Sequence, residues 1–225
     1  MLTAVIFDFD GIIVDTEPLH YKAFQEVLIP LGMGYGWDEY LGHYIGFDDR
    51  DAFREAFRRS GRELSTDDLH RLIEEKAAAF QRTIASGVEP YAGVVELITT
   101  LSGKLPVGLC SGALRSDIDP ILSQLGLTGA FDCMVTADEV SASKPDPESY
   151  ALAVRRLAAA FPAHSLTPGG CLAIEDTPAG IASATGAGLK VLAVSNSYPA
   201  ERLAGAVKVV DSLAGIDIQS LSNLL

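Results

Sequence analysis

Short runs of apolar residues alternate along the chain with longer segments in which apolar residues recur at helical spacing. The runs cover residues 4–7, 105–110, 133–135, 171–174 and 191–194, with a further one at 207–210. Continuous apolar runs of this length are typical of strands buried on both faces. The segments between them carry apolar residues three and four apart, such as Val94, Leu97, Ile98 and Leu101, or Ile118, Ile121, Leu122 and Leu125. The alternation predicts an α/β, Rossmann-like fold, a parallel sheet with helices on both faces and 207–210 as an edge strand.

Residues 16–88 interrupt this alternation. They contain helical segments but no convincing strand, and one helical face carries apolar residues at Leu69, Leu72, Ile73, Ala77, Phe80 and Ile84. At about 150 residues per domain, 225 residues correspond to one full domain and a smaller addition. We therefore expect a core domain formed by 1–15 and 89–225 and a small all-helical domain formed by 16–88, joined to the core by two connections that act as a hinge.

The composition, 48% hydrophobic and 21% charged, is that of an ordinary globular protein. The net charge of −13 disfavours nucleic acids and anionic membrane surfaces as partners. Three widely spaced cysteines favour neither a disulfide framework nor a zinc site and fit a reducing compartment. The first apolar run ends at Asp8, too early for a signal peptide or a membrane span. We expect a cytoplasmic protein without nucleic-acid or membrane partners, and the sequence points to no particular protein partner.

Polar side chains follow three of the predicted strands directly. Asp8 and Asp10 follow the first run, Ser111 follows the run ending at 110, and Glu175 and Asp176 follow the run ending at 174. Parallel sheets bind ligands outside the carboxyl ends of their strands, so these groups are expected to meet. Four carboxylates in one place would repel one another unless a cation neutralises them. Mg²⁺ suits them, because it takes carboxylate oxygens and substrate phosphate oxygens as ligands.

Each of these signals also has a plain structural interpretation. The Asp-x-Asp-Gly sequence after the first run is a common turn sequence, and Ser111 is a candidate N-cap for a helix beginning near residue 114. Lys144 in the SKPDP sequence is a candidate solvated loop lysine. Glu175 and Asp176 are candidates for the acidic start of a helix. Their joint occurrence in this order at strand ends favours a functional site.

These residues resemble the four motifs of the haloacid dehalogenase-like (HAD-like) superfamily. The motifs read DFDGIIVDTE from Asp8, CSG around Ser111, SKPDP around Lys144 and IEDTPAGIASATGAG around Glu175 and Asp176. The resemblance covers essentially the whole chain. It is to the branch with a small helical cap, which includes β-phosphoglucomutase and many sugar-phosphate and phosphoglycolate phosphatases, and it implies that 16–88 is a cap domain closing over the active site.

The resemblance also implies a role for each acidic group. Asp8 is the nucleophile that becomes an aspartyl phosphate, and Asp10 is the general acid and then the general base. Magnesium is held by Asp8, the backbone carbonyl of Asp10 and Asp176, with Glu175 acting through a metal-bound water. Because dehalogenases of the superfamily lack the second aspartate of the first motif, Asp10 favours phosphoryl transfer over carbon–halogen cleavage.

The phosphoryl group has its own implied binding residues. Ser111, Gly112 and Lys144 bind its oxygens, and the lysine charge offsets the negative charge that develops in the transition state. Gly11 lets the backbone turn tightly after the two acids.

The expected cap domain carries three residues that match the β-phosphoglucomutase branch. Lys76 lies on the apolar stripe of its helix, where it either snorkels along the helix or faces the active site as the matching lysine of that branch does. Thr16 and His20 match residues that position the acid/base aspartate. The alternatives are a helix N-cap for Thr16 and an exposed first-turn histidine for His20.

The specificity loop departs from that branch. Aligned through Gly46, the chain has Ile45 and Asp49 where the mutase has a lysine and an arginine that bind a second phosphate. Arg50 is adjacent, but a neighbouring residue on a helix points about 100° away.

The absence of that pair of cations favours hydrolysis of the aspartyl phosphate. We therefore predict a Mg²⁺-dependent phosphatase acting on a small phosphorylated metabolite, of the sugar-phosphate or phosphoglycolate type. The alternatives are a β-phosphoglucomutase-type mutase and a non-catalytic relative that binds a phosphorylated metabolite.

Overall fold

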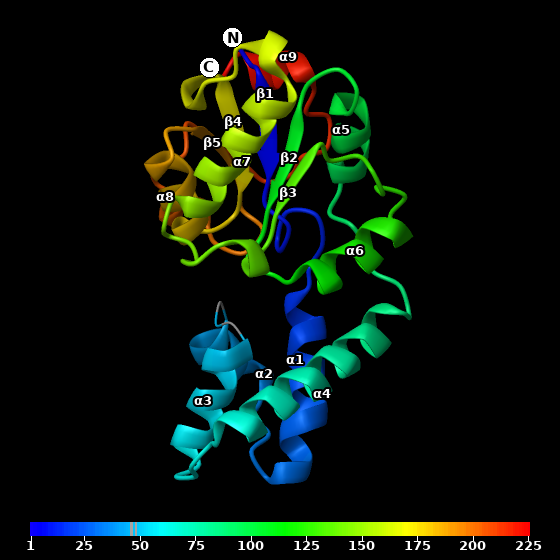
Figure 1. Ribbon diagram of the computed structural model, residues 1–225, viewed down its shortest axis with the longest axis vertical. Helices are drawn as coiled ribbons and strands as arrows, with labels where there is room; N and C mark the ends of the chain where they lie inside the picture. Colours follow the sequence, from blue (N-terminus) through cyan, green and yellow to red (C-terminus); the bar gives the residue numbers. More distant parts are fainter. Residues whose placement is uncertain (46, 48) are drawn as a thin grey trace. The chain divides into compact units, whose positions relative to one another are not determined.

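The computed structural model describes residues 1–45, 47 and 49–225 (Figure 1). The chain forms two compact units, one made of Met1–Asp15 with Glu89–Leu225 and one made of Thr16–Val88. We refer to them as the core domain and the cap domain. The first apolar run and the second half of the chain belong to the same unit, because strand β1 pairs with strands that come after residue 100.

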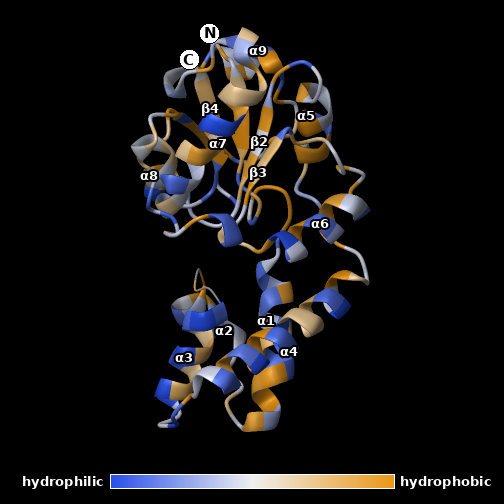
Figure 2. Ribbon diagram, viewed as in Figure 1, coloured by the Kyte–Doolittle hydropathy of each residue, from blue (hydrophilic) through white to orange (hydrophobic). Residues whose placement is uncertain are grey.

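Within the described residues, the core domain holds a parallel six-stranded sheet in the order β3-β2-β1-β4-β5-β6. The strands are β1 Ala4–Phe7, β2 Val107–Cys110, β3 Cys133–Val135, β4 Cys171–Glu175, β5 Lys190–Val194 and β6 Lys208–Val210. Every apolar run predicted as a strand is therefore one, and the run at 207–210 supplies an edge strand. The α/β fold class is confirmed. Figure 2 shows the central strands as hydrophobic ribbons, as expected for a sheet covered on both faces.

The helices of the core domain lie between these strands in the chain. They are α5 Val94–Leu101, α6 Arg115–Gln124, α7 Glu148–Ala160, α8 Pro178–Gly186 and α9 Ile218–Ser222. Helices α7 and α8 pack on one face of the sheet, against Ala4, Ile6 and Cys110 among others. Side chains of neighbouring strand residues point to opposite faces, so Val5 and Phe7 face the other side of the sheet, where they are also buried. In the described residues, no helix is both long and apolar enough to cross a membrane.

The cap domain is built from helices around its own apolar core. They are α1 Glu17–Leu28, α2 Trp37–Glu39, which continues into a π-helical turn at Tyr40–Tyr44, α3 Asp49–Arg59 and α4 Thr66–Ile84. The core contains Phe24, Leu28, Phe53 and Leu72. The predicted apolar stripe of α4 is largely buried, including Leu69, Leu72, Phe80 and Ile84. The described part of 16–88 contains no strand, so its stability depends on packing between helices.

Candidate active site

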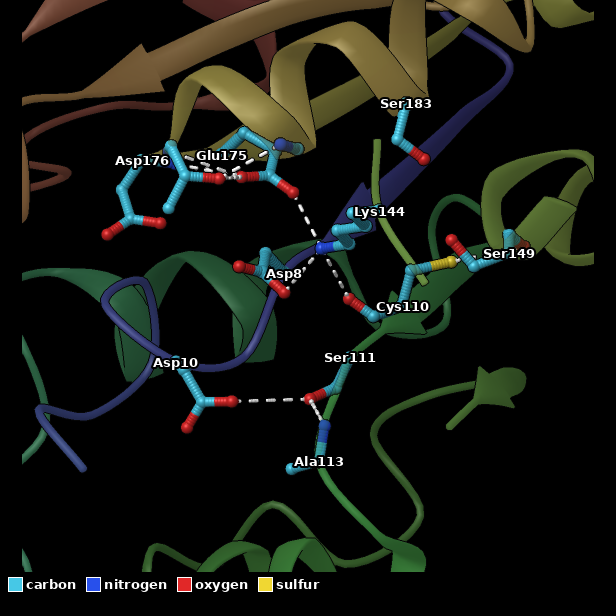
Figure 3. Close-up of polar contacts among 12 residues, drawn as sticks. Asp8, Asp10, Cys110, Ser111, Ala113, Lys144, Ser149, Glu175, Asp176 and Ser183 are labelled. Atoms are coloured by element: carbon cyan, nitrogen blue, oxygen red, sulfur yellow. Dashed lines mark hydrogen bonds and ion pairs between the residues drawn. The ribbon is translucent and has the colours of Figure 1, made fainter. Parts of the chain in front are cut away.

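The carboxyl ends of neighbouring strands carry the polar groups of the site. Asp8 follows β1, Glu175 ends β4 and Ser111 follows β2, and β1 lies between the other two strands. These groups therefore come together although they are up to 167 positions apart in the chain, which is the difference between 8 and 175 (Figure 3). Asp8, Ser111, Glu175 and Asp176 are all at most 6% exposed, so the site is set into the protein.

Lys144 connects the ends of the three strands. Its Nζ atom donates to Asp8 Oδ1 at 2.7 Å, to Glu175 Oε1 at 2.6 Å and to the carbonyl oxygen of Cys110 at 3.2 Å. Burial lowers the pKa of Lys144, but the charges of Asp8 and Glu175 outweigh it and raise that pKa above its ordinary value. The side chain is 14% exposed, so the solvated-loop interpretation of Lys144 is wrong.

The loop that carries Lys144 is tied at both ends to helices. Glu148 at the start of α7 accepts hydrogen bonds from the backbone N–H groups of Ser141 and Ala142, both at 2.9 Å. The Ser183 hydroxyl of α8 donates to the carbonyl oxygen of Asp146 at 2.6 Å. These bonds hold the lysine side chain toward the strand ends (Figure 3).

Three carboxylates form a group that fits a metal ion. Asp8, Glu175 and Asp176 each offer an oxygen atom within 4.8 Å of the others. Both carboxylate oxygens of Asp176 are buried without a hydrogen-bond partner in the described residues, as suits an oxygen that is to bind a cation. Burial raises the pKa of Asp176 to about 7, and burial together with the Glu175 charge raises the pKa of Asp8 well above its ordinary value. A hard divalent cation would relieve this repulsion.

The Asp10 side chain points toward Ser111 (Figure 3). Its Oδ2 atom accepts a long hydrogen bond from the Ser111 hydroxyl at 3.4 Å, and the same hydroxyl oxygen accepts from the backbone N–H of Ala113 at 3.0 Å (Figure 3). Ser111 does not cap helix α6, whose N-cap is Leu114, so the N-cap interpretation is wrong. Gly112 is exposed beside Ser111, which leaves its backbone open to a ligand.

Two glycines allow the acidic groups to approach the backbone closely. Gly11 has φ of 75°, and a Cβ atom there would lie 1.9 Å from Asp176 Oδ2. A Cβ atom on Gly180 would lie 1.9 Å from the Glu175 carboxylate. Helix α8 begins at Pro178 with Thr177 as its N-cap, since the Thr177 side chain accepts from the N–H of Gly180 at 2.9 Å. Glu175 therefore belongs to strand β4 and does not start the helix.

Two further residues support the site and were not among the predicted ones. The Asn196 side chain donates to the carbonyl oxygen of Gly11 at 2.7 Å, and the Tyr150 hydroxyl donates to Glu175 Oε1 at 2.8 Å. Asn196 follows strand β5, so the rule that strand ends carry the site, had it been extended to this strand, could have found it. Tyr150 lies within helix α7, where nothing in the sequence distinguishes it from an ordinary core aromatic residue.

A family model described as haloacid dehalogenase-like hydrolase matches residues 5–194. The chain belongs to this family. The expected superfamily resemblance is confirmed, and because the match spans both domains, it covers all four motifs. Hydrolases of this family that act as phosphatases generally use a divalent metal, and the acidic group of Asp8, Glu175 and Asp176 fits one.

Named relatives within this hydrolase family include phosphatases. The fructose-1-phosphate phosphatase YqaB of Escherichia coli strain K12 is 32% identical over 192 residues, covering 84% of this chain and 95% of YqaB. The protein CbbY of Rhodobacter capsulatus is 32% identical over 207 residues, covering 88% of this chain and 87% of CbbY. Among solved structures, a β-phosphoglucomutase from Clostridium difficile superposes with a TM-score of 0.83 at 25% identity, covering 100% of this chain and 97% of that one.

In this family member, two of the predicted cap residues, His20 and Lys76, contact each other within the cap domain. Lys76 is 1% exposed, so it does not snorkel to solvent. Its Nζ atom donates to Asp49 Oδ1 at 2.7 Å and to His20 Nδ1 at 2.9 Å. Burial and the Lys76 charge lower the pKa of His20 well below its ordinary value. The His20 ring stacks on Phe80 at 4.3 Å, so His20 is not the freely exposed first-turn residue of the alternative.

The remaining cap predictions have different outcomes. Thr16 is the N-cap residue of α1, as the structural alternative expected, although its side chain makes no capping hydrogen bond. Arg50 is exposed. Gly46 lies outside the described residues. Contacts of Thr16, His20, Lys76, Gly46 and Arg50 with a substrate stay predictions.

Proposed function

We propose that this hydrolase is a Mg²⁺-dependent phosphatase that releases phosphate from a small phosphorylated metabolite through an aspartyl phosphate on Asp8. The observation that carries the proposal is the buried cluster in which Lys144 bridges Asp8 and Glu175 beside the unpartnered oxygens of Asp176. A nucleophilic carboxylate, a cation for phosphoryl oxygens and a metal-ligand set are the parts that phosphoryl transfer needs.

In the first step, one carboxylate oxygen of Asp8 attacks phosphorus, and the bond from phosphorus to the substrate oxygen breaks. Asp10 donates a proton to the leaving oxygen. In the second step, water attacks phosphorus, Asp10 takes the proton from that water, and the bond to Asp8 breaks. The Ser111 hydroxyl and the Lys144 ammonium bind the phosphoryl oxygens. Asp8, Asp176 and the carbonyl of Asp10 would hold Mg²⁺, with Glu175 acting through a metal-bound water, and the bound ion would supply positive charge for the transferring group.

The cap domain supports hydrolysis over the mutase alternative. Asp49 occupies a position where the mutase branch carries a phosphate-binding cation, and here its carboxylate accepts from Lys76 at 2.7 Å. The lysine charge is thus already paired with an acid and is a poor anchor for a second phosphate. A bisphosphate intermediate is therefore not held for reorientation, and water takes the phosphoryl group from Asp8. The similarity to YqaB makes small sugar monophosphates the first substrates to test.

The experiment is turnover of p-nitrophenyl phosphate with Mg²⁺ by the wild-type protein, Asp8→Asn and Asp217→Asn. Asp217 caps helix α9 by accepting from the N–H of Ser220 at 2.7 Å, and asparagine caps equally well. Asp217→Asn is therefore a control for the loss of one carboxylate. We expect turnover by the wild type and the control and none by Asp8→Asn. Unchanged turnover by Asp8→Asn removes the proposed mechanism, and an inactive wild type supports the binding-only alternative.

A second assay separates phosphatase from mutase. The wild type is given β-glucose 1-phosphate, fructose 1-phosphate and phosphoglycolate in turn, and both free phosphate and glucose 6-phosphate are measured. Release of free phosphate supports the proposal. Accumulation of glucose 6-phosphate without free phosphate would show a mutase.

A further inference from the structure

Tyr150 contacts both charged groups that meet at the end of β4. Its hydroxyl lies 2.8 Å from Glu175 Oε1, and Lys144 Nζ lies 5.1 Å from the centre of its ring. Tyr150 and Glu175 are both fully buried. An ionised carboxylate has no proton to donate, so the hydroxyl is the donor in this bond.

All the donors of Lys144 are already in use. An ammonium group carries three hydrogens, and Lys144 has three acceptors, at Asp8, Glu175 and the carbonyl oxygen of Cys110 (Figure 3). To bind an oxygen of a phosphoryl group, the lysine must release one of them.

Lys144 can release Glu175 only if Glu175 Oε1 keeps another hydrogen-bond donor. Its Oε2 atom accepts from the Thr177 hydroxyl at 3.3 Å and from the backbone N–H groups of Asp176 and Thr177 at 3.1 and 3.4 Å. Its Oε1 atom has Lys144 and Tyr150. Without the tyrosine hydroxyl, release by the lysine would leave a buried anionic oxygen with no hydrogen bond from a protein group of the described residues, which is strongly unfavourable.

We propose that Tyr150 is a positioning residue whose hydroxyl keeps Glu175 Oε1 hydrogen-bonded while Lys144 moves from Glu175 to a phosphoryl oxygen. This inference rests on the proposed function, because it needs Lys144 to bind the phosphoryl group. It implies that the tyrosine acts on phosphate binding through the lysine, although it touches neither phosphate nor Asp8. Phenylalanine at this position keeps the ring packing but removes the hydroxyl donor. Lys144 should then stay hydrogen-bonded to Glu175 and be less available to a phosphoryl oxygen.

The test compares Tyr150→Phe with Tyr21→Phe. The Tyr21 hydroxyl donates to the carbonyl oxygen of Tyr35 at 3.1 Å in the cap domain, so both variants lose one tyrosine hydrogen bond. The dissociation constant of inorganic phosphate is measured by calorimetry in Mg²⁺, and kcat and KM are measured with p-nitrophenyl phosphate. We expect Tyr150→Phe to raise the phosphate dissociation constant and KM about tenfold, as for loss of one hydrogen bond to a charged group. We expect wild-type values for Tyr21→Phe.

The Glu175→Gln background shows whether the effect passes through the carboxylate. A neutral amide oxygen forms no ion pair with Lys144, so adding Tyr150→Phe there should change phosphate binding by less than about twofold. Wild-type phosphate binding by Tyr150→Phe, or the full tenfold effect in the Glu175→Gln background, overturns the inference. If the wild type turns over substrate and Tyr150→Phe does so with unchanged constants, only this inference fails. If the wild type neither binds phosphate nor turns over substrate, the proposed function fails and this inference with it.

Discussion

Lys76 carries a positive charge into the interior of the cap domain. It is 1% exposed, donates to Asp49 and His20, and lies 5.0 Å from the ring centre of Phe24 and 5.2 Å from that of Phe80. Lys76→Met keeps an unbranched chain between the two rings and deletes only the charge and its hydrogen bonds. The variant therefore measures how much the buried ion pair contributes to the stability of the cap domain.

The size of the stability loss in Lys76→Met depends on how exposed the Asp49 carboxylate is. A hydrogen bond to a charged group contributes about 1.5–3 kcal/mol, and a fully buried charge left unpaired costs about 3–5 kcal/mol. The Asp49 side chain is 22% exposed, so water reaches its carboxylate and the larger cost does not apply in full. We expect Lys76→Met to lower the free energy of unfolding of the cap domain by about 2 kcal/mol. Adding Asp49→Asn should restore about half of it, because the unpaired charge is then gone.

The chain offers a probe that reports on this domain alone. Its single tryptophan is Trp37, which packs against Tyr21 and Tyr40 in the cap domain with ring centres 5.1 and 5.3 Å away. Tryptophan fluorescence in urea therefore follows unfolding of the cap domain. A loss of about 2 kcal/mol moves the midpoint to lower urea by about 1–2 M. A midpoint for Lys76→Met equal to or above that of the wild type refutes the reasoning. The desolvation of the ammonium would then be at least as unfavourable as its ion pair and hydrogen bonds are favourable.

Three further predictions follow from the geometry. The pKa of His20 lies below its value in the unfolded chain, so the unfolded state takes up a proton that the folded state does not. The free energy of unfolding therefore has its full value above about pH 6.5. Below that pH it decreases by up to about 1.4 kcal/mol per pH unit, and His20→Gln should remove this part of the pH dependence. Urea titrations between pH 5 and 7 check this, and equal slopes for both proteins contradict it. Chelation by EDTA should abolish turnover, and excess Mg²⁺ should raise the Tm of the wild type but not of Asp176→Asn in calorimetry. An equal rise in both would place the ion elsewhere. Gly11→Ala should lower kcat/KM about 100-fold, because its Cβ atom would displace the Asp176 carboxylate. Wild-type kinetics for Gly11→Ala would show that the loop adapts.

Residues that act through their place at a strand end were accessible from the sequence. The apolar runs predicted every strand that the structure describes, and the rule that parallel strands share a carboxyl edge predicted that Asp8, Glu175 and Asp176 lie together, as they do. The same rule extended to strand β5 points to Asn196. These inferences work because strand formation and side-chain order along a strand are local properties of the chain.

Contacts between distant segments were not accessible from the residue pattern. Taken alone, Lys144 is a candidate exposed loop lysine, and only the family resemblance singled it out as a phosphate-binding residue. Its bonds to Asp8 and Glu175 depend on how its loop is tied to α7 and α8. The pairing of Lys76 with Asp49 joins α4 to α3 across 27 positions, and neither helix encodes it alone.

By itself, the sequence determined the α/β class, the order of strands and helices along the chain and the acidic residues that stand at the strand ends, because each of these depends on neighbouring residues. Only the tertiary structure decided which atoms of those residues meet, that all three hydrogens of the Lys144 ammonium are donated, and that the Tyr150 hydroxyl donates to Glu175. The direction of a buried side chain is set by packing and charge from segments far away in the chain, and a one-dimensional pattern does not carry that information.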